Sequence, residues 1–264
     1  MNMFDGFRFR RVSSPIHDMD PRVKFLYVLV IFAAAVLFDQ LLPLLVLFVA
    51  QMPLILVAGV KRECMRSMRG SSLFAVIIFA TNMLSLYLYS GGGYGSIPSI
   101  IERSLAMTFR FMVLVESFSI FFLTTSPDHL GLALEQSGVP FDLCFAFTTA
   151  IRFVPVMAEE AQTIIDAQKA RGLELERGNF IRRVKNYVPV LIPLLVNSIR
   201  RSLELAEAME SRAWGASPKR TNLYVLKMKR SDYYMIITSL IILVLAAYIR
   251  LYISIPSIYE LLSA

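Results

Sequence analysis

Two apolar stretches near the start of the chain, VKFLYVLVIFAAAVLF at 23–38 and LLPLLVLFVAQMPLILVAGV at 41–60, decide its fold class. A helix needs about 20 mostly apolar residues to cross the hydrocarbon core of a bilayer. Only Asp39 and Gln40 separate the two stretches, so the pair predicts two membrane-spanning helices joined by a tight turn. The whole chain agrees, because 56% of its 264 residues are hydrophobic and its mean hydropathy is +0.59.

Three more apolar segments predict further spans, at about 71–89, 104–124 and 233–253. The last two are separated by a long stretch that mixes apolar and charged residues. We therefore expect an all-α polytopic membrane protein with about five transmembrane helices and a helical domain inserted before the last span. The predicted parts are an N-terminal membrane domain with four spans (1–125), the inserted domain (126–230), and the last span with the C-terminus (231–264).

Lysine and arginine predict the orientation, because these residues accumulate in cytoplasmic loops. They cluster in the N-terminal arm, between the second and third spans, and before the last span: Arg8, Arg10, Arg11, Arg22, Lys24, Lys61, Arg62, Arg66, Arg69, Lys219, Arg220, Lys227, Lys229 and Arg230. The Asp39 turn and the 91–98 loop contain none. We expect the N-terminus and the inserted domain to be cytoplasmic and the C-terminus to lie outside. This bias accounts for the net charge of +7, and no nucleic-acid motif accompanies it.

The inserted domain contains one short pattern twice. Ala170-Arg171-Gly172 and Ser211-Arg212-Ala213 each place an arginine between small residues at the end of a predicted helix. The two helices, at about 155–171 and 193–212, would be about 25 and 30 Å long. The second is expected to begin at Pro193, because a proline nitrogen cannot donate the hydrogen bond that a regular helix requires.

An arginine between small neighbours can present its guanidinium group to a carboxylate or a backbone carbonyl without obstruction. The plain alternative for Arg171 and Arg212 is a helix-end cation that the helix dipole stabilises by about 0.3–1 kcal/mol. The repeated context favours docking, in which each helix tip inserts into a groove of a soluble partner and transmits motion into the membrane.

Two ionisable residues, Arg110 and Glu116, lie within the fourth predicted span. Charged side chains inside a bilayer are costly unless they are paired or hydrated, so they usually face the interior of a protein. Six residues apart on one helix, they are poorly placed to pair with each other. We interpret them as polar contacts to other helices, and a role in a transport path is the alternative.

Four stretches of the chain resemble one membrane-protein family. They are His17-Asp18-Met19-Asp20-Pro21-Arg22-Val23-Lys24; Phe122-Leu123-Thr124-Thr125-Ser126-Pro127 with Leu130 and Ala133-Leu134; Arg152-Phe153-Val154-Pro155 with Ala170-Arg171-Gly172; and Glu210-Ser211-Arg212-Ala213 with Gly215. The family is the transmembrane T component of energy-coupling factor (ECF) transporters, which are ATP-binding cassette (ABC) importers, and it includes the Q subunit of cobalt and nickel permeases. The four stretches occur in the family's order over most of the chain.

The resemblance implies a non-catalytic subunit in the plasma membrane of a prokaryote. In this family two helix tips dock into two ABC ATPases, and the membrane helices hold a separate substrate-binding S component for uptake of a vitamin or of cobalt or nickel. The chain itself would bind no cofactor or metal, since ATP and Mg²⁺ belong to the ATPases. Ala170-Arg171-Gly172 matches the family's Ala-Arg-Gly triplet in full, whereas Ser211 and Ala213 replace its alanine and glycine. The transported compound cannot be read from this chain.

Two other functions remain as alternatives. A self-sufficient secondary transporter would usually contain repeated halves with interrupted spans, and the only repeat here lies in the inserted domain. An intramembrane metal-dependent enzyme would need ligands such as His17, Asp18 and Asp20. However, no metalloprotease motif is present, and Asp20-Pro21 is a typical helix start. Cys64 and Cys144 are isolated and lack zinc-ligand spacing.

Overall fold

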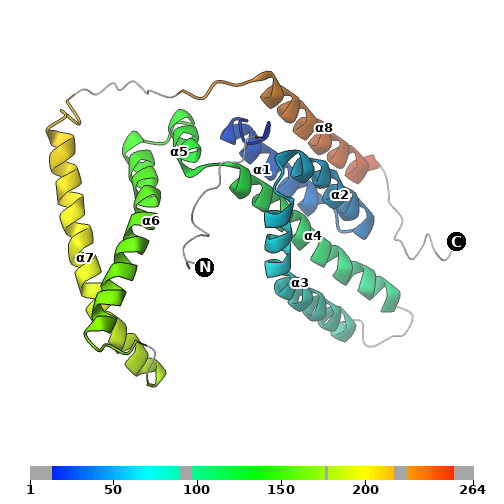
Figure 1. Ribbon diagram of the computed structural model, residues 1–264. Coiled ribbons are helices and arrows are strands. Elements are labelled where there is room, and N and C mark those ends of the chain that lie inside the picture. Colours follow the sequence, from blue (N-terminus) through cyan, green and yellow to red (C-terminus); the bar gives the residue numbers. More distant parts are fainter. Residues whose placement is uncertain (1–13, 90–96, 176–177, 217–224, 253–264) are drawn as a thin grey trace. The chain divides into compact units, whose positions relative to one another are not determined.

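The computed structural model describes residues 14–89, 97–175, 178–216 and 225–252. Within these residues the chain forms eight α-helices and no strand, so it is all-α (Figure 1). The helices are α1 (Pro21–Leu37), α2 (Leu41–Ala58), α3 (Lys61–Tyr89), α4 (Ile97–Thr124), α5 (Pro127–Gln136), α6 (Phe141–Ala170), α7 (Phe180–Glu210) and α8 (Arg230–Tyr252). The predictions for the arm before residue 14, for residues 91–96, Lys219 and Arg220, and for the C-terminus after 252 lie outside the described residues.

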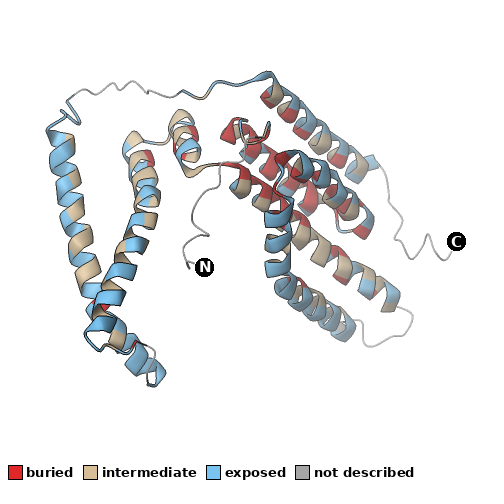
Figure 2. Cartoon of the chain, in the orientation of Figure 1, coloured by how far each residue is buried: buried red, intermediate tan, exposed pale blue. Residues whose placement is uncertain are grey.

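The helices belong to two compact units. The described residues of the membrane unit are 14–89, 97–133 and 226–252, and those of the hairpin unit are 134–175, 178–216 and 225. Buried residues are concentrated in the membrane unit, mainly in α1, α2 and α4, whereas α6 and α7 of the hairpin unit are mostly exposed (Figure 2).

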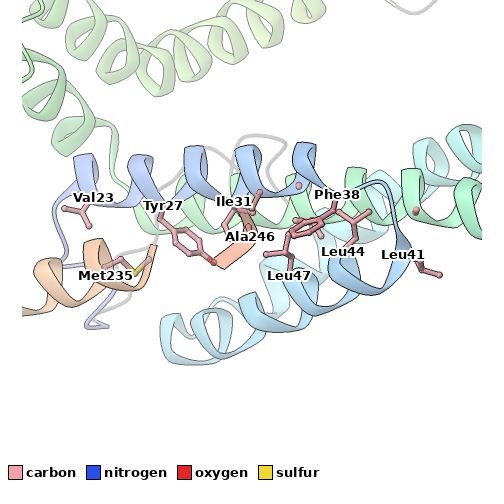
Figure 3. Close-up of a cluster of buried hydrophobic side chains, with 13 residues drawn as sticks. Val23, Tyr27, Ile31, Phe38, Leu41, Leu44, Leu47, Met235 and Ala246 are labelled. Carbon is pink, nitrogen blue, oxygen red and sulfur yellow. The ribbon is translucent and has the colours of Figure 1, made fainter. Parts of the chain in front are cut away.

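Helices α1 and α4 form the centre of the membrane unit. Helix α1 packs against α4 and α8, while α2 and α3 pack against α4. Tyr27 and Ile31 of α1 and Phe38, which follows it, belong to one apolar cluster with Leu44 and Leu47 of α2 (Figure 3). The helix begins as its sequence predicts, with Asp20 as N-cap accepting the Arg22 N–H (2.9 Å) and proline at the first helical position.

Five helices within the described residues are long and apolar enough to cross a membrane, namely α2, α3, α4, α6 and α8. Together with the all-helical fold they identify a polytopic membrane protein. The set differs from the predicted one, which counted Val23–Phe38 and not α6. Helix α1, with 17 residues, is too short to be counted as a span. Helix α6 is counted because most of its charged residues lie near its C-terminal end, which leaves a long apolar first part. By packing, however, α1 is part of the membrane unit.

Both helices of the hairpin unit are longer than predicted. Helix α6 continues through Pro155 and has 30 residues; α7 continues through Pro189 and Pro193 and has 31. The prediction that regular helix begins at Pro193 was wrong for a reason outside α7. Pro193 cannot donate to the carbonyl of Pro189, but the Gln168 side chain of α6 donates to that carbonyl instead (3.2 Å). A contact between helices thus replaces the lost backbone bond.

Candidate functional site

Helices α6 and α7 form an antiparallel pair joined by residues 171–179. Polar contacts connect their middle parts. Glu160 of α6 accepts hydrogen bonds from Asn197 (2.7 Å) and Arg201 (3.1 Å) of α7, and the Ser198 hydroxyl donates to the Met157 sulfur (3.1 Å). Because the helices run in opposite directions, the end of α6 lies beside the first part of α7.

Aromatic side chains join the other end of the pair. Trp214, which follows α7, packs against Phe141 and Phe145 in the first turns of α6, with ring centroids 5.5 and 4.5 Å apart. The end of α7 therefore lies beside the start of α6. The C-terminal tips of the two helices consequently lie at opposite ends of the pair. A 30-residue helix is about 45 Å long, rather than the 25–30 Å that the predicted boundaries imply.

The first tip ends in a Schellman motif, the hydrogen-bonded turn that commonly closes an α-helix. The Leu173 N–H donates to the Gln168 carbonyl (3.0 Å), and the Gly172 N–H donates to the Lys169 carbonyl (2.9 Å). Gly172 has the left-handed φ of +87° that the motif requires. Arg171 is therefore the last residue before the chain reverses direction.

The second tip has the same hydrogen-bond pattern. The Trp214 N–H donates to the Met209 carbonyl (3.0 Å), and the Ala213 N–H donates to the Glu210 carbonyl (2.9 Å). Arg212 thus occupies the position that Arg171 has in the first tip. Ala213 takes the glycine position with a φ of +58°, the only positive φ of a non-glycine residue in the part of the chain that the structure describes. The two tips are matched in geometry although their triplets differ in sequence.

All six residues of the two triplets are exposed: Ala170, Arg171, Gly172, Ser211, Arg212 and Ala213. Neither guanidinium group forms a side-chain hydrogen bond or an ion pair with the described residues. Each tip therefore presents an arginine whose donors are available to acceptors on another molecule. The structure does not bring the two arginines together but holds them at opposite ends of the helix pair.

Arg110 and Glu116 have different surroundings. Arg110 donates to the Phe38 carbonyl and to the Asp39 carboxylate (2.8 Å), and Arg250 of α8 lies 3.7 Å from the same carboxylate. This contact connects α4 with the turn between α1 and α2. Glu116 is fully buried, and neither of its carboxyl oxygens has a hydrogen-bond partner among the described residues.

A buried polar cluster that the sequence analysis missed connects three helix ends in the membrane unit. Lys24 is 4% exposed, and its ammonium group donates to the carbonyls of Thr124 (2.8 Å) and His17 (3.2 Å). Asp232, fully buried, accepts the backbone N–H groups of Asp20 (3.1 Å) and Lys229 (2.7 Å), and its charge acts on Lys24. The one signal in the sequence that could have revealed this cluster is Lys24, a charged residue inside an apolar stretch.

His17 lies at the edge of this cluster, and its Nδ1 forms a hydrogen bond with the Ser14 hydroxyl (2.8 Å). Partial burial and the positive charge of Lys24 lower the pKa of His17 below its usual value. No group of three His, Cys, Asp or Glu residues that could hold a metal ion occurs within residues 14–89, 97–175, 178–216 and 225–252.

Comparison with known proteins identifies the family. The family model described as cobalt transport protein, CbiQ, matches residues 12–223, which include both arginine tips. The chain belongs to the CbiQ family. It is similar to proteins named energy-coupling factor transporter transmembrane protein EcfT, so it is a T component of the EcfT/CbiQ type and a multi-pass membrane subunit of an ECF transporter.

Three of these relatives show how much of the chain the similarity covers. The protein of Thermosediminibacter oceani is 31% identical over 83% of this chain and 88% of its own length. That of Clostridium kluyveri is 29% identical over 91% and 94%, and that of Staphylococcus aureus is 32% identical over 85% and 89%. The similarity therefore covers nearly the full length of each relative.

Proposed function

We propose that this T component couples two ABC ATPase subunits to a substrate-binding S component, with Arg171 contacting one ATPase and Arg212 the other. The observation that carries the proposal is the matched pair of exposed arginine tips at opposite ends of the α6–α7 pair. A guanidinium group without an internal partner can form charge-assisted hydrogen bonds with carboxylates or carbonyls in a groove of each ATPase.

The length of the helix pair provides the mechanical link. Two tips about 45 Å apart fit two separate docking sites better than one. When ATP draws the two ATPases together, the docking sites move, and helices joined by the Glu160, Asn197 and Arg201 contacts move with them. Rigid-body rotation of this kind is a common way to transmit motion between subunits.

In this arrangement the T component carries out no chemical step and binds no cofactor or metal, since ATP and Mg²⁺ are bound by the ATPases. The S component binds the transported vitamin or transition-metal ion and contacts the membrane unit. The complex lies in the plasma membrane of a prokaryote, with the N-terminus and the hairpin unit in the cytoplasm, as the distribution of Lys and Arg indicates.

Charge reversal at the tips tests the proposal. The Arg171→Glu/Arg212→Glu variant is expressed together with the two ATPases and the S component encoded in the same genome. We expect each single substitution to weaken co-purification with the ATPases and the double substitution to abolish both co-purification and ATP-dependent uptake. The reason is that a carboxylate repels the acceptors that each arginine binds.

Arg200→Glu is the matched control. Arg200 is exposed on α7 away from the tips, so this variant undergoes the same change of charge and should keep assembly and uptake. The fluorescence of Trp214, the single tryptophan of the chain, verifies that the helix pair is intact in every variant. Normal assembly and uptake by the double variant would refute the docking role of the arginines.

A further inference from the structure

Glu116 is a buried carboxyl group to which the proposed coupling mechanism assigns no role. It lies on α4, one of the helices long and apolar enough to cross a membrane, and it is 0% exposed. Neither of its oxygens has a hydrogen-bond partner among the described residues. An ionised carboxylate in such a place would be strongly unfavourable unless a cation or several donors compensated it.

In the part of the chain that the structure describes, no cation of the neighbouring helices compensates it. The groups of α1 and α3 that interact electrostatically with Glu116 are the Tyr27 hydroxyl and the Cys64 thiol. Helix α2, which also packs against α4, contains no charged residue. The basic side chains of the surrounding helices are directed elsewhere: Lys24 to the Thr124 and His17 carbonyls, Arg110 to Asp39, and Arg66 and Arg69 to the surface.

Gln51 of α2 provides the second observation. It is also 0% exposed; its Nε2 donates to the Val113 carbonyl of α4 (3.3 Å), and its Oε1 has no partner among the residues described. Side chains of a helix lean toward its N-terminus, so the Glu116 carboxyl group extends over the turn that contains Val113. Two buried groups that both need a hydrogen bond are thus directed to the same turn of α4.

The chemistry of the two groups decides what is bound there. An ionised Glu116 can only accept hydrogen bonds, and so can Gln51 Oε1, so these two oxygens cannot satisfy each other. A protonated Glu116 has one O–H donor, which Gln51 Oε1 can accept. One proton therefore removes the buried charge and supplies the missing donor at once.

We propose that Glu116 and Gln51 form an intramembrane proton-binding site, in which the carboxylate of Glu116 takes up one proton and donates it in a hydrogen bond to Gln51 Oε1. The ligand is a proton and not a metal ion, because the site offers no second carboxylate. A rearrangement that separates α2 from α4 and admits water would release the proton, so the packing of these helices is linked to proton binding.

Labelling with dicyclohexylcarbodiimide tests the site, because this apolar reagent reacts with protonated carboxyl groups in apolar surroundings. The full chain in lipid nanodiscs is treated from about pH 6 to about pH 8, with and without added Na⁺, K⁺ or Mg²⁺, and the adducts are located by mass spectrometry. We expect an adduct at Glu116 that these cations do not suppress. Glu116→Gln should lose it, whereas Glu63→Gln, which removes an exposed carboxyl group of α3, should retain it.

Either of two labelling results would overturn the proposal. Suppression of the adduct by one of the cations would indicate a cation site, and the absence of an adduct at Glu116 over the whole range would indicate an ionised carboxylate. None of these measurements involves the ATPases or uptake, so their failure would leave the coupling proposal intact.

Substitution gives a second, independent test. Glu116→Gln imitates the protonated acid in shape and can donate to Gln51, whereas Glu116→Ala leaves Gln51 without a donor. We expect the thermal unfolding midpoint of Glu116→Gln in detergent to match that of the unmodified chain and the midpoint of Glu116→Ala to be clearly lower. Equal loss in both variants would show that the negative charge is required and would overturn the proposal.

Discussion

At the scale of single residues, the two tips show how one backbone geometry is obtained from two different sequences. Gly172 adopts the left-handed conformation with a φ of +87°, which glycine tolerates without strain. Ala213 adopts nearly the same conformation in the second tip, where its Cβ costs about 1 kcal/mol. The departure from the family's triplet therefore leaves the shape of the tip unchanged and lowers its local stability.

This difference predicts that two substitutions have opposite effects on the stability of the tips. Ala213→Gly should stabilise the second tip by about 1 kcal/mol, which would slow hydrogen exchange of the Trp214 amide roughly fivefold. Gly172→Ala should accelerate exchange of the Leu173 amide by a similar factor. Gly70→Ala is the control, because Gly70 lies within α3 and a Cβ there would contact nothing within 4 Å. Unchanged exchange at both tips would contradict the strain argument.

At the scale of helices, the buried cluster around Lys24 holds three helix ends together. Lys24 in the first turn of α1 binds the last carbonyl of α4, at Thr124. Asp232 at the start of α8 binds the backbone before α1, at Asp20. Because both charged side chains are buried, each depends on the other and on these backbone groups. The cluster thus fixes the end of α4, from which the chain continues into α5.

Removal of both charged members of this cluster should destabilise the chain by less than the sum of the two separate removals. Lys24→Met leaves Asp232 without its cation and two carbonyls without a donor, so we expect a loss of about 3 kcal/mol in stability. Lys24→Met combined with Asp232→Asn should lose less than the sum of the two single variants. Thermal unfolding of the purified chain in detergent measures the three losses.

Lys229→Met serves as the control for this series. Lys229 and Asp18 form an ion pair of 3.9 Å between exposed side chains, and such pairs contribute little to stability. The variant should therefore unfold at nearly the same temperature as the unmodified chain. Strictly additive losses in the Lys24 and Asp232 variants would show that the two residues do not depend on each other.

At the scale of the whole molecule, the path through the membrane follows from two kinds of information. By length and apolar character α6 could cross a membrane and α1 is not counted, whereas packing places α1 within the apolar core of the membrane unit. Helix α6 carries Glu159, Glu160, Asp166 and Lys169 in its C-terminal half. We therefore expect α1, α2, α3, α4 and α8 to cross the membrane and α6 to remain in the cytoplasm.

This topology predicts which sites are accessible in intact cells. A C-terminal tag should be cleaved by external protease and an N-terminal tag should be protected, because five crossings place the termini on opposite sides. In a Lys169→Cys variant that also carries Cys64→Ser and Cys144→Ser, an impermeant maleimide should react only after the cells are permeabilised. Labelling from outside would show that α6 crosses the membrane.

Much of this organisation was predictable from local sequence. Apolar length predicted an all-helical membrane protein, Asp20-Pro21 predicted the start of α1, and small neighbours around Arg171 and Arg212 predicted two exposed tips. These features depend on hydrophobicity, on caps and on residue size, which act within a few positions of the chain. The positions of Arg110 and Glu116 inside a span were equally visible.

Other features depend on residues that are distant in sequence, and no local pattern reveals them. Where α7 continues through Pro193, the Gln168 side chain of α6 binds the Pro189 carbonyl, and the buried charge of Lys24 interacts with Asp232 from the other end of the chain. The sequence by itself therefore determined the class of protein and the two arginine tips. Only the tertiary structure decided the helix lengths, the opposite placement of the tips and the partners of the buried polar groups, because hydrogen bonds and burial arise from packing between helices.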